Sequence, residues 1–167
     1  NSGVDTFGFW TPLRRPGGEN MAVAISPALA VFEVSNLTNG VDRPVNQPNA
    51  WVAEFKDESP SIELTWSSPQ TISRVELVFD TDADHPMESV LFNHPERDVI
   101  FCVKEYRVIA GDGYELFAIT DNHQTRRSHL LSEPVTTNQL RIELTRPHTD
   151  VPAALFAVRI HSNAEEV

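Results

Sequence analysis

Apolar residues alternate with polar ones in five short segments of this 167-residue chain, and this period of two is the feature that most restricts its fold. Alternation places one set of side chains against a core and the other in water, as in a β-strand with one buried face. Such segments, separated by Pro, Gly and Asn-Asp turns, predict an all-β protein built as an antiparallel β-sandwich or barrel. The expected inward-facing sets are Ile62, Leu64 and Trp66; Val75, Leu77 and Phe79; Tyr106, Val108 and Ala110; Leu140, Ile142 and Leu144; and Phe156, Val158 and Ile160.

The sandwich is expected to span residues 21–162. Residues 1–20 are rich in Gly and Pro and show no period, so we interpret them as a linker or an N-terminal arm, and residues 163–167 as a frayed tail. Because the first and last strands of a sandwich often pair, the termini are expected to lie together, which suits a module of a larger protein. The opening NSGVDTFGFW has no targeting pattern, and we expect the chain to be a piece excised from something longer.

The chain carries 24 acidic residues against 13 basic ones, a formal net charge of −11. Phosphate backbones repel such a chain, and no cluster of Lys and Arg interleaved with aromatic residues offsets this, so nucleic acid is not an expected partner. Anionic membranes are disfavoured for the same reason, and no run of about 18 apolar residues predicts a membrane span. The single cysteine, Cys102, lies in an apolar run, which predicts a small buried side chain rather than a reactive thiol.

The order of the segments resembles one family of β-sandwiches. The family's opening strand is matched by ENMAVAIS, its first long loop by VSNLTNGVDRP followed by NAW, and its central hairpin by SIELTWSSPQTISRVELVFD. The next hairpin is matched by EYRVIAGDGYELFAITDN, and the last two strands by TTNQLRIELT and ALFAVRIH. In this order the segments resemble the galactose-binding-like, discoidin-type (coagulation-factor C-type) domain, a jelly-roll β-sandwich, over roughly residues 20–162.

A narrower resemblance is to the carbohydrate-binding-module-like C-terminal domain of some bacterial FAD-dependent oxidoreductases and polysaccharide-active enzymes. It rests on NGVDRPVNQPNAWVAE, VELVFDTD and NHQTRRSHLL. Flavin chemistry would then lie in another domain, because nothing here resembles a Gly-rich dinucleotide-binding turn between a strand and a helix. The chain also lacks a Gly-x-Ser-x-Gly elbow and a His-Glu-x-x-His motif, so it is not expected to be an enzyme.

In the discoidin-type family, the loop that corresponds to Asn36–Trp51 usually wraps a structural calcium. Calcium takes about six to eight oxygen ligands, and Asn39 and Asp42 are the residues that could contribute side-chain oxygens here. The chain departs from the family at two acids, since Asn39 stands where Asp is usual and Ala157 stands where the last strand has Glu. The alternative is a loop held by hydrogen bonds of its own Asn and Thr side chains.

Three polar loops are expected to form a binding surface at one rim: Asn36–Trp51, Asp80–Asp98 and Asp121–His129. Trp51 could give a sugar ring an apolar stacking face, or it could pack in the core. Trp66 alternates in phase with Ile62 and Leu64, so it is expected to pack in the core. The second loop is rich in Asp, Glu and His. It could bind calcium or zinc, but its spacing matches no metal motif, and long rim loops are more often recognition surfaces.

The third loop contains two adjacent arginines, Arg126 and Arg127. Adjacent strand residues face opposite ways, so only one of them can point at a given site. A guanidinium suits carboxylates and the vicinal hydroxyls of sugars, and the alternative is a solvated arginine paired with one of the many acids. The predicted ligand-binding residues are Arg43, Asn49, Trp51, Asp84, His85, His123, Arg126 and Arg127.

Together these observations predict a non-catalytic accessory module of a larger bacterial enzyme, secreted or periplasmic, that binds carbohydrate through its rim loops. The alternative is a structural domain that packs on the parent enzyme's catalytic domain and binds no sugar. That alternative predicts an exposed apolar patch, with Trp51, Arg126 and Arg127 engaged internally. An independent enzyme would instead need a deep cleft with titratable groups of perturbed pKa.

Overall fold

A computed structural model describes residues 31–44, 49–55, 59–81 and 101–162. It contains a short 3₁₀ helix, η1 (Val34–Thr38), and six strands. The strands are β1 (Trp51–Ala53), β2 (Ser61–Phe79), β3 (Val103–Ala110), β4 (Glu115–Ile119), β5 (Arg126–Pro147) and β6 (Ala153–His161). All neighbours are antiparallel, in the order β1-β6-β2-β5-β3-β4. Within the described ranges, no helix has the length and hydropathy needed to cross a membrane.

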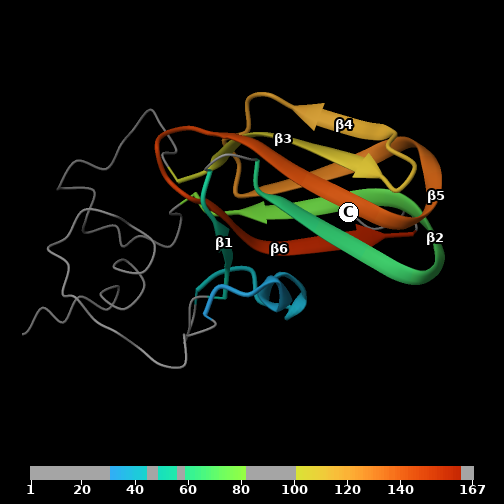
Figure 1. The fold of residues 1–167 in the computed structure, drawn as a ribbon, viewed down its shortest axis with the longest axis horizontal. Coiled ribbons are helices and arrows are strands. Elements are labelled where there is room, and N and C mark those ends of the chain that lie inside the picture. The colour runs from blue at the N-terminus through green and yellow to red at the C-terminus, as the bar shows by residue number, and fades with distance from the viewer. Residues whose placement is uncertain (1–30, 45–48, 56–58, 82–100, 163–167) are drawn as a thin grey trace, which may run out of the picture.

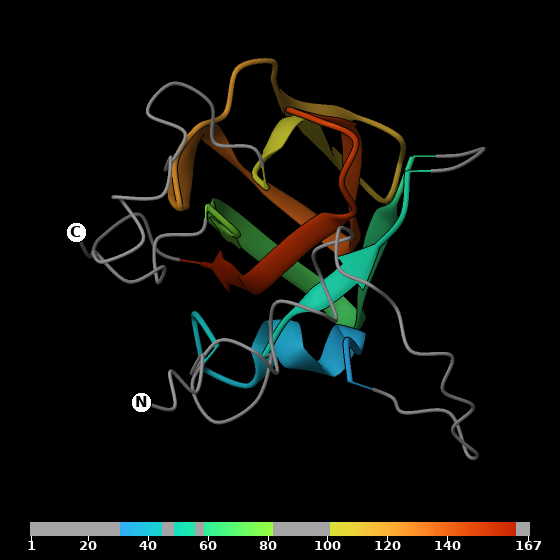
Figure 2. The ribbon, with the colours of Figure 1, turned by 90° about the vertical axis from the view of Figure 1, so that its left-hand side faces the viewer.

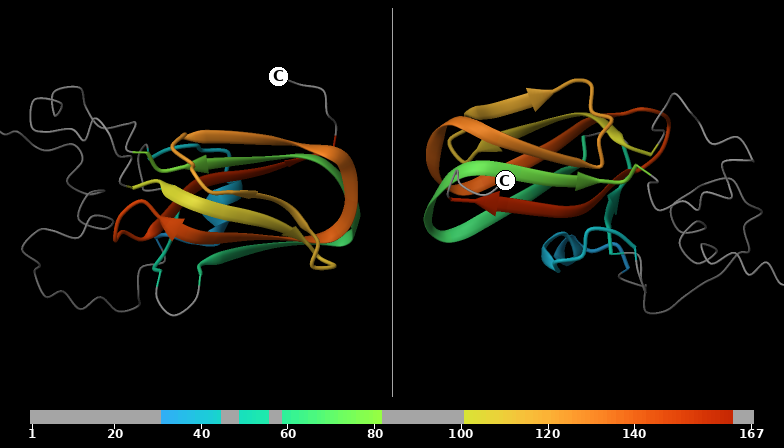
Figure 3. Two further views of the ribbon diagram at one scale, coloured as in Figure 1. Left: turned by 90° about the horizontal axis from the view of Figure 1, so that it is seen from above. Right: turned by 180° about the vertical axis from the view of Figure 1, so that it is seen from behind.

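The two long strands turn one sheet into a sandwich. The first half of β2 pairs with the last half of β5, and beyond a register shift after Thr65 the second half of β2 pairs with the first half of β5. Figures 1 and 3 show both strands curving over together at one end, so that their halves lie in opposite layers. One layer contains β1, β6 and the adjoining halves of β2 and β5, and the other contains the remaining halves with β3 and β4. The predicted antiparallel sandwich is therefore confirmed.

The central hairpin predicted over Ser61–Asp80 is wrong in its pairing. The chain does reverse there, but β2 is one continuous strand of 19 residues whose halves pair with β5 and not with each other. β5 runs beside both halves of β2 and bends with them. The bend therefore carries both strands from one layer of the sandwich to the other, instead of forming a hairpin turn within one layer. Pro69 lies in the stretch of β2 that has no register partner in β5, where its missing N–H removes no ladder bond.

The core lies between the layers and contains most of the predicted inward-facing residues. Leu77, Tyr106 and Ile142 are each no more than 1% exposed, and Trp66 packs against this core as expected. Cys102 is fully buried, which confirms the prediction, and burial raises the pKa of its thiol to about 12. The predicted hairpin between β3 and β4 is also present, with Gly113 at φ +88° in its turn.

The alternation fails in β6, where a second cluster buries the outer face. Phe156 was expected to face the central core, but it packs with Ala50, Val78 and Ala157 on the other side of the layer. Phe32 and Val52 pack against this cluster, and η1 lies against β6 (Figures 1 and 2). The segment before β2 therefore covers the outer face of β6, and residues 153–158 are buried on both sides.

Candidate functional site

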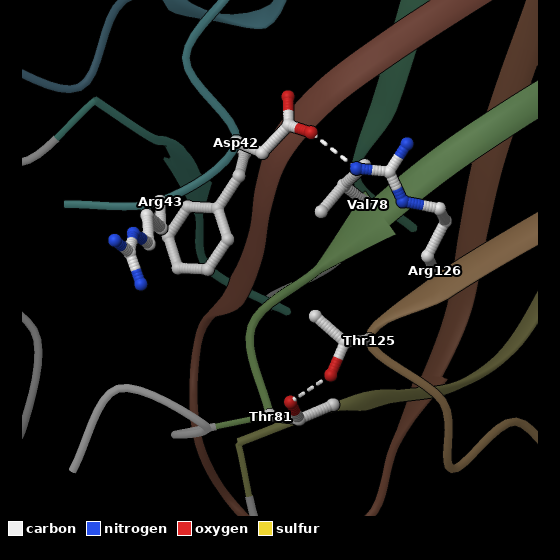
Figure 4. Close-up of a pocket in the computed structure, with 7 residues that line it drawn as sticks. Asp42, Arg43, Val78, Thr81, Thr125 and Arg126 are labelled. Carbon is white, nitrogen blue, oxygen red and sulfur yellow. Dashed lines mark hydrogen bonds and ion pairs between the residues drawn. The ribbon is translucent and has the colours of Figure 1, made fainter.

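A hollow of about 200 Å³ is lined by residues at the end of β2 and the start of β5, away from the bend of these two strands. Figure 1 shows the bend at the opposite end of the sandwich. The hollow forms where the loop after η1 meets the end of β2 and the start of β5, and we call it the Asp42–Arg126 hollow. Its lining combines charged, hydroxyl and apolar side chains: Asp42, Arg43, Val78, Thr81, Thr125, Arg126 and Phe156. Figure 4 shows the arginines on opposite sides of the hollow and the two threonines facing each other.

Strand register explains which side chains reach this face of the sheet. Val78 pairs with Arg126 of β5 and with Ala157 of β6, so all three share the outer face. Two residues earlier on β2, Glu76 is the direct partner of Arg159 on β6. Because strand side chains repeat every second residue, Glu76 and Val78 point the same way. The polar group of the hollow is therefore built by three neighbouring strands.

Two acids and two arginines form an ion-paired group beside the hollow. Asp42 is paired with both Arg126 and Arg159. The Oε1 atom of Glu76 accepts from Nη1 of Arg126 at 2.8 Å and from Nη1 of Arg159 at 2.6 Å. Burial opposes the charge on Arg159, but its hydrogen bonds to Asp42 and Glu76 prevail and raise its pKa. Arg126 has a side chain that is 52% exposed, so its outer edge stays open to a ligand.

The loop that carries Asp42 is held by side-chain amides. Asn36 Nδ2 donates to the carbonyl oxygens of Val31 at 2.9 Å and Ala50 at 2.8 Å, which ties together chain segments on either side of the loop. Asn39 Nδ2 donates to Asn49 Oδ1 at 3.2 Å, and Asn39 Oδ1 accepts from the backbone N–H of Val41 at 2.8 Å.

Asn49 is buried and has a left-handed backbone, with φ at 50°. Asn tolerates this conformation better than most residues, at some cost in strain. Its Nδ2 donates to the carbonyl oxygen of Arg43 at 3.4 Å, which helps to place Arg43 at the mouth of the hollow. That Asn49 contacts a ligand stays a prediction; its contacts with Asn39 and Arg43 show that it helps to hold the loop.

The predicted calcium ligands are engaged in other contacts. Asp42 lies against two guanidinium groups, and the Asn39 amide bonds to its own loop. Two cations at the only candidate carboxylate of this loop do not fit a third cation, and no group of three or more His, Cys, Asp or Glu that could hold a metal occurs among the described residues. A calcium site at Asn39 and Asp42 stays a prediction, and the geometry favours the alternative of a loop held by its own hydrogen bonds.

Thr81 and Thr125 form one side of the hollow, the lower side in Figure 4. Thr81 Oγ1 and Thr125 Oγ1 lie 2.5 Å apart, and the backbone N–H of Phe79 donates to the Thr125 carbonyl at 2.7 Å. These bonds fix the end of β2 to the start of β5. None of Thr81, Thr125, Val78, Glu76 or Arg159 was predicted as a site residue, and Phe156 was predicted only as a core residue. Only the register between strands brings these residues together, and the outward phase of Glu76 and Arg159 in their alternating segments is the signal that could have indicated them.

Arg127 faces the opposite way from Arg126, as adjacent strand residues must. It pairs in register with the core residue Leu77, and its Nη1 donates to Gln124 Oε1 at 3.3 Å. On the same side, His129 stacks on Phe117 with ring centroids 4.2 Å apart, and its Nε2 is 2.7 Å from the hydroxyl of Tyr106. Burial, and then the charge of Arg127, lower the pKa of His129 to about 4. Arg127 therefore does not line the hollow.

The other predicted residues that the structure describes do not line the hollow. Trp51 is half-buried on β1 and packs against the central core, which agrees with the packing interpretation. His123 is exposed, with Nδ1 3.3 Å from the carbonyl oxygen of Asp121. Asp84 and His85 lie outside the described residues. Of the eight predicted ligand and metal residues that the structure describes, three line the hollow together, Asp42, Arg43 and Arg126.

No protein-family model matches the sequence, and no curated protein matches it. Solved structures do match. The family 32 carbohydrate-binding module from Streptococcus pneumoniae EndoD superposes with a TM-score of 0.59, at 14% identity over 83% of this chain and 91% of that chain. The fold is that of family 32 carbohydrate-binding modules. This confirms the predicted galactose-binding-like β-sandwich.

Two further modules with this fold were solved with sugars bound. One is CBM32-2 of a GH31 protein bound to GalNAc, with a TM-score of 0.60 at 10% identity over 80% of this chain and 90% of that chain. The other is chitosan-binding module 2 of the chitosanase/glucanase from Paenibacillus sp. IK-5, in complex with chitotriose. Its TM-score is 0.57 at 13% identity, over 80% of this chain and 88% of that chain. At these identities the likeness shows a shared fold.

Proposed function

We propose that this chain is a non-catalytic accessory module that binds carbohydrate at the Asp42–Arg126 hollow, as part of a larger secreted or periplasmic bacterial enzyme. The observation that carries the proposal is the convergence of Asp42, Arg43 and Arg126, together with paired threonine hydroxyls, on one hollow. The shared fold supports it, because neighbouring structures with this fold are modules that bind GalNAc and chitotriose.

The lining matches the two kinds of surface that a sugar ring presents. Arginine N–H groups donate to hydroxyl oxygens, and the carboxylate of Asp42 and the threonine hydroxyls accept from hydroxyl hydrogens. The buried side chains of Val78 and Phe156 line the hollow and offer apolar contact to the C–H groups of the ring. The volume suits a single sugar residue, and the hollow is shallow, so we expect millimolar rather than nanomolar affinity.

The test is isothermal titration of the whole chain with neutral sugars, amino sugars and uronic acids, comparing Arg126→Ala with the wild type. Removing charge-assisted hydrogen bonds should weaken binding about tenfold or more, which is at least ~1.4 kcal/mol. Arg141→Ala is the matched control, because Arg141 is an ion-paired strand arginine of nearly equal side-chain exposure, 53%, that does not line the Asp42–Arg126 hollow. Equal losses in both variants, or no binding of any sugar at millimolar concentration, would reject the proposal.

A second candidate function is a structural domain that packs on its parent enzyme. Two observations favour it: Arg126 is already paired with Asp42 and Glu76, and Trp51 packs on the core. Val34 and Leu130, 54% and 63% exposed, are apolar side chains that such a contact could cover. The measurement is the melting temperature of the parent's catalytic domain with and without this chain. A rise together with no sugar binding would select this function.

A further inference from the structure

Tyr114 presents an aromatic ring to solvent at the end of the sandwich opposite the Asp42–Arg126 hollow. The residue is 64% exposed and follows the turn between β3 and β4 (Figure 1). Its backbone is fixed on both sides: its N–H donates to Asp112 Oδ1 at 3.0 Å, and its carbonyl accepts from the N–H of Ala110 at 2.8 Å. An aromatic ring is normally stabilised by burial, so a ring that stays exposed on a hydrogen-bonded backbone is better explained as a contact for a ligand than as a packing residue.

A second hollow, of about 280 Å³, adjoins this ring where β5 bends between the layers. Leu116 and Leu131 give it apolar walls that rest on the central core, and Pro134 adds a rigid one. Ser132 and Glu133, both exposed, contribute a hydroxyl and a carboxylate. Among the residues that the structure describes, none donates a hydrogen bond to the Glu133 carboxylate or forms an ion pair with it, so this carboxylate is available as an acceptor.

We propose that Tyr114 and this second hollow form a separate carbohydrate subsite that takes one pyranose ring. A pyranose presents an apolar face of C–H groups and an edge of hydroxyls. The tyrosine ring offers a flat apolar face of matching size, while Glu133 can accept from two hydroxyl groups and Ser132 can donate to a third. The site combines what small-ligand pockets usually combine, an aromatic or apolar wall with a few placed polar groups.

Charge restricts which sugars fit. Asp112, Glu115 and Glu133 are the acids nearest this turn and hollow in sequence, and the whole chain has a net charge of −11. Of these three acids, Glu115 has Arg107 3.6 Å away, but Arg107 lies closer to Glu143, at 2.5 Å, so it offsets the charge of Glu115 only in part. A uronic acid would bring a further negative charge, whereas a neutral or amino sugar would not. The subsite should therefore accept neutral and amino pyranoses and reject uronic acids.

The subsite is independent of the proposed function at the other end. The two hollows share no lining residue. A module with a sugar site at each end could hold two segments of one glycan, which raises the overall affinity for a long chain above that for either unit. Failure of one site therefore does not decide the other.

The experiment is an amide NMR titration of the whole chain with a neutral hexose, an amino hexose and a glucuronic acid at millimolar concentration. The expected result is shift changes at Tyr114, Leu116, Ser132 and Glu133 with the first two sugars and none with the third. Tyr114→Ala should remove these changes or weaken binding about tenfold, while Tyr114→Phe, which keeps the ring, should stay within about threefold of the wild type. Because Tyr114 is exposed, both variants should melt with the wild type.

Arg126→Ala separates the two sites, because it should abolish changes around the Asp42–Arg126 hollow and leave those at Tyr114 in place. Three results would overturn the proposal: no changes at these amides with any sugar, changes that persist unaltered in Tyr114→Ala, or an equally strong response to glucuronic acid.

Discussion

Asn36 tests how the loop beside the candidate site is held. Its side-chain amide donates two hydrogen bonds, to the carbonyl oxygens of Val31 at 2.9 Å and Ala50 at 2.8 Å. A single NH₂ group thus joins two carbonyls from opposite ends of the loop. In a calcium-binding loop, a bound cation joins backbone carbonyl oxygens in the same way. The most informative change is Asn36→Asp, because it keeps the shape of the side chain and replaces both donors with an oxygen.

The cost can be worked out from these two bonds. Each hydrogen bond contributes about 1 kcal/mol net, and a partly buried carbonyl left without a donor costs about 1 kcal/mol or more besides. The new oxygen also faces the two carbonyls and repels them. We expect the free energy of unfolding to fall by about 2 to 4 kcal/mol, and the melting temperature to fall by roughly 5 to 15 °C for a domain of this size.

The assay is thermal unfolding followed by circular dichroism, with chelator and then with millimolar calcium. In Asn36→Asp a carboxylate and two carbonyls would surround one point, so calcium should recover part of the lost melting temperature. Asn36→Ala should be destabilised without this recovery. Asn138→Asp, the same change at an exposed position on β5, should shift stability by no more than about 0.5 kcal/mol.

Two results would refute this reasoning. If Asn36→Asp melts with the wild type in chelator, the amide does not hold the loop. If the wild type itself loses several degrees in chelator, a metal holds the loop, and the calcium site predicted from the family resemblance is present after all.

Two further predictions concern charged groups. Arg159→Met leaves Asp42 and the buried Glu76 with Arg126 alone, so we expect the free energy of unfolding to fall by about 1 to 3 kcal/mol, measured by denaturant unfolding. If the exposed control Arg146→Met loses as much, the paired arrangement is contradicted. The pKa of His129 lies near 4 when folded and near 6.5 when unfolded, so acidification protonates the unfolded state first. The free energy of unfolding should therefore fall between about pH 6.5 and pH 4, by on the order of 1 to 2 kcal/mol for this partly exposed ring. The fall should be smaller in His129→Phe. An equal fall in both proteins would show that other groups cause it.

The fold could be predicted from the sequence largely because burial imposes a period on strands. Ile62, Leu77, Tyr106 and Ile142 were assigned inward from alternation alone, and all four lie in the core. The prediction was wrong at Phe156, because the segment before β2 covers the outer face of β6, and both faces of this strand are therefore buried. Alternation reports one covered face, so it carries no information where both faces are covered.

The candidate site could be predicted only in part, because it depends on which strand residues lie opposite one another. Arg43 and Arg126 were predicted as ligand-binding residues of two polar loops, and Asp42 was predicted as a calcium ligand that the family resemblance implies; all three line the hollow. Glu76 and Arg159 were not predicted, although they complete the ion-paired group, because their pairing is set by the register of β2 on β6. A shift of one residue would turn Glu76 toward the core, and only packing of the assembled sheet fixes that register.

The bend shared by β2 and β5 explains why one end of the sandwich gathers the site. Because both strands fold over the core, each returns to the end where it began, but in the other layer. The last residues of β2 and the first of β5 therefore meet at one rim, where the Thr81 and Thr125 hydroxyls join them. A flat hairpin over Ser61–Asp80 would have paired the halves of β2 with each other. That pairing would have displaced β5 from Val78, and with it the arginine that defines the hollow.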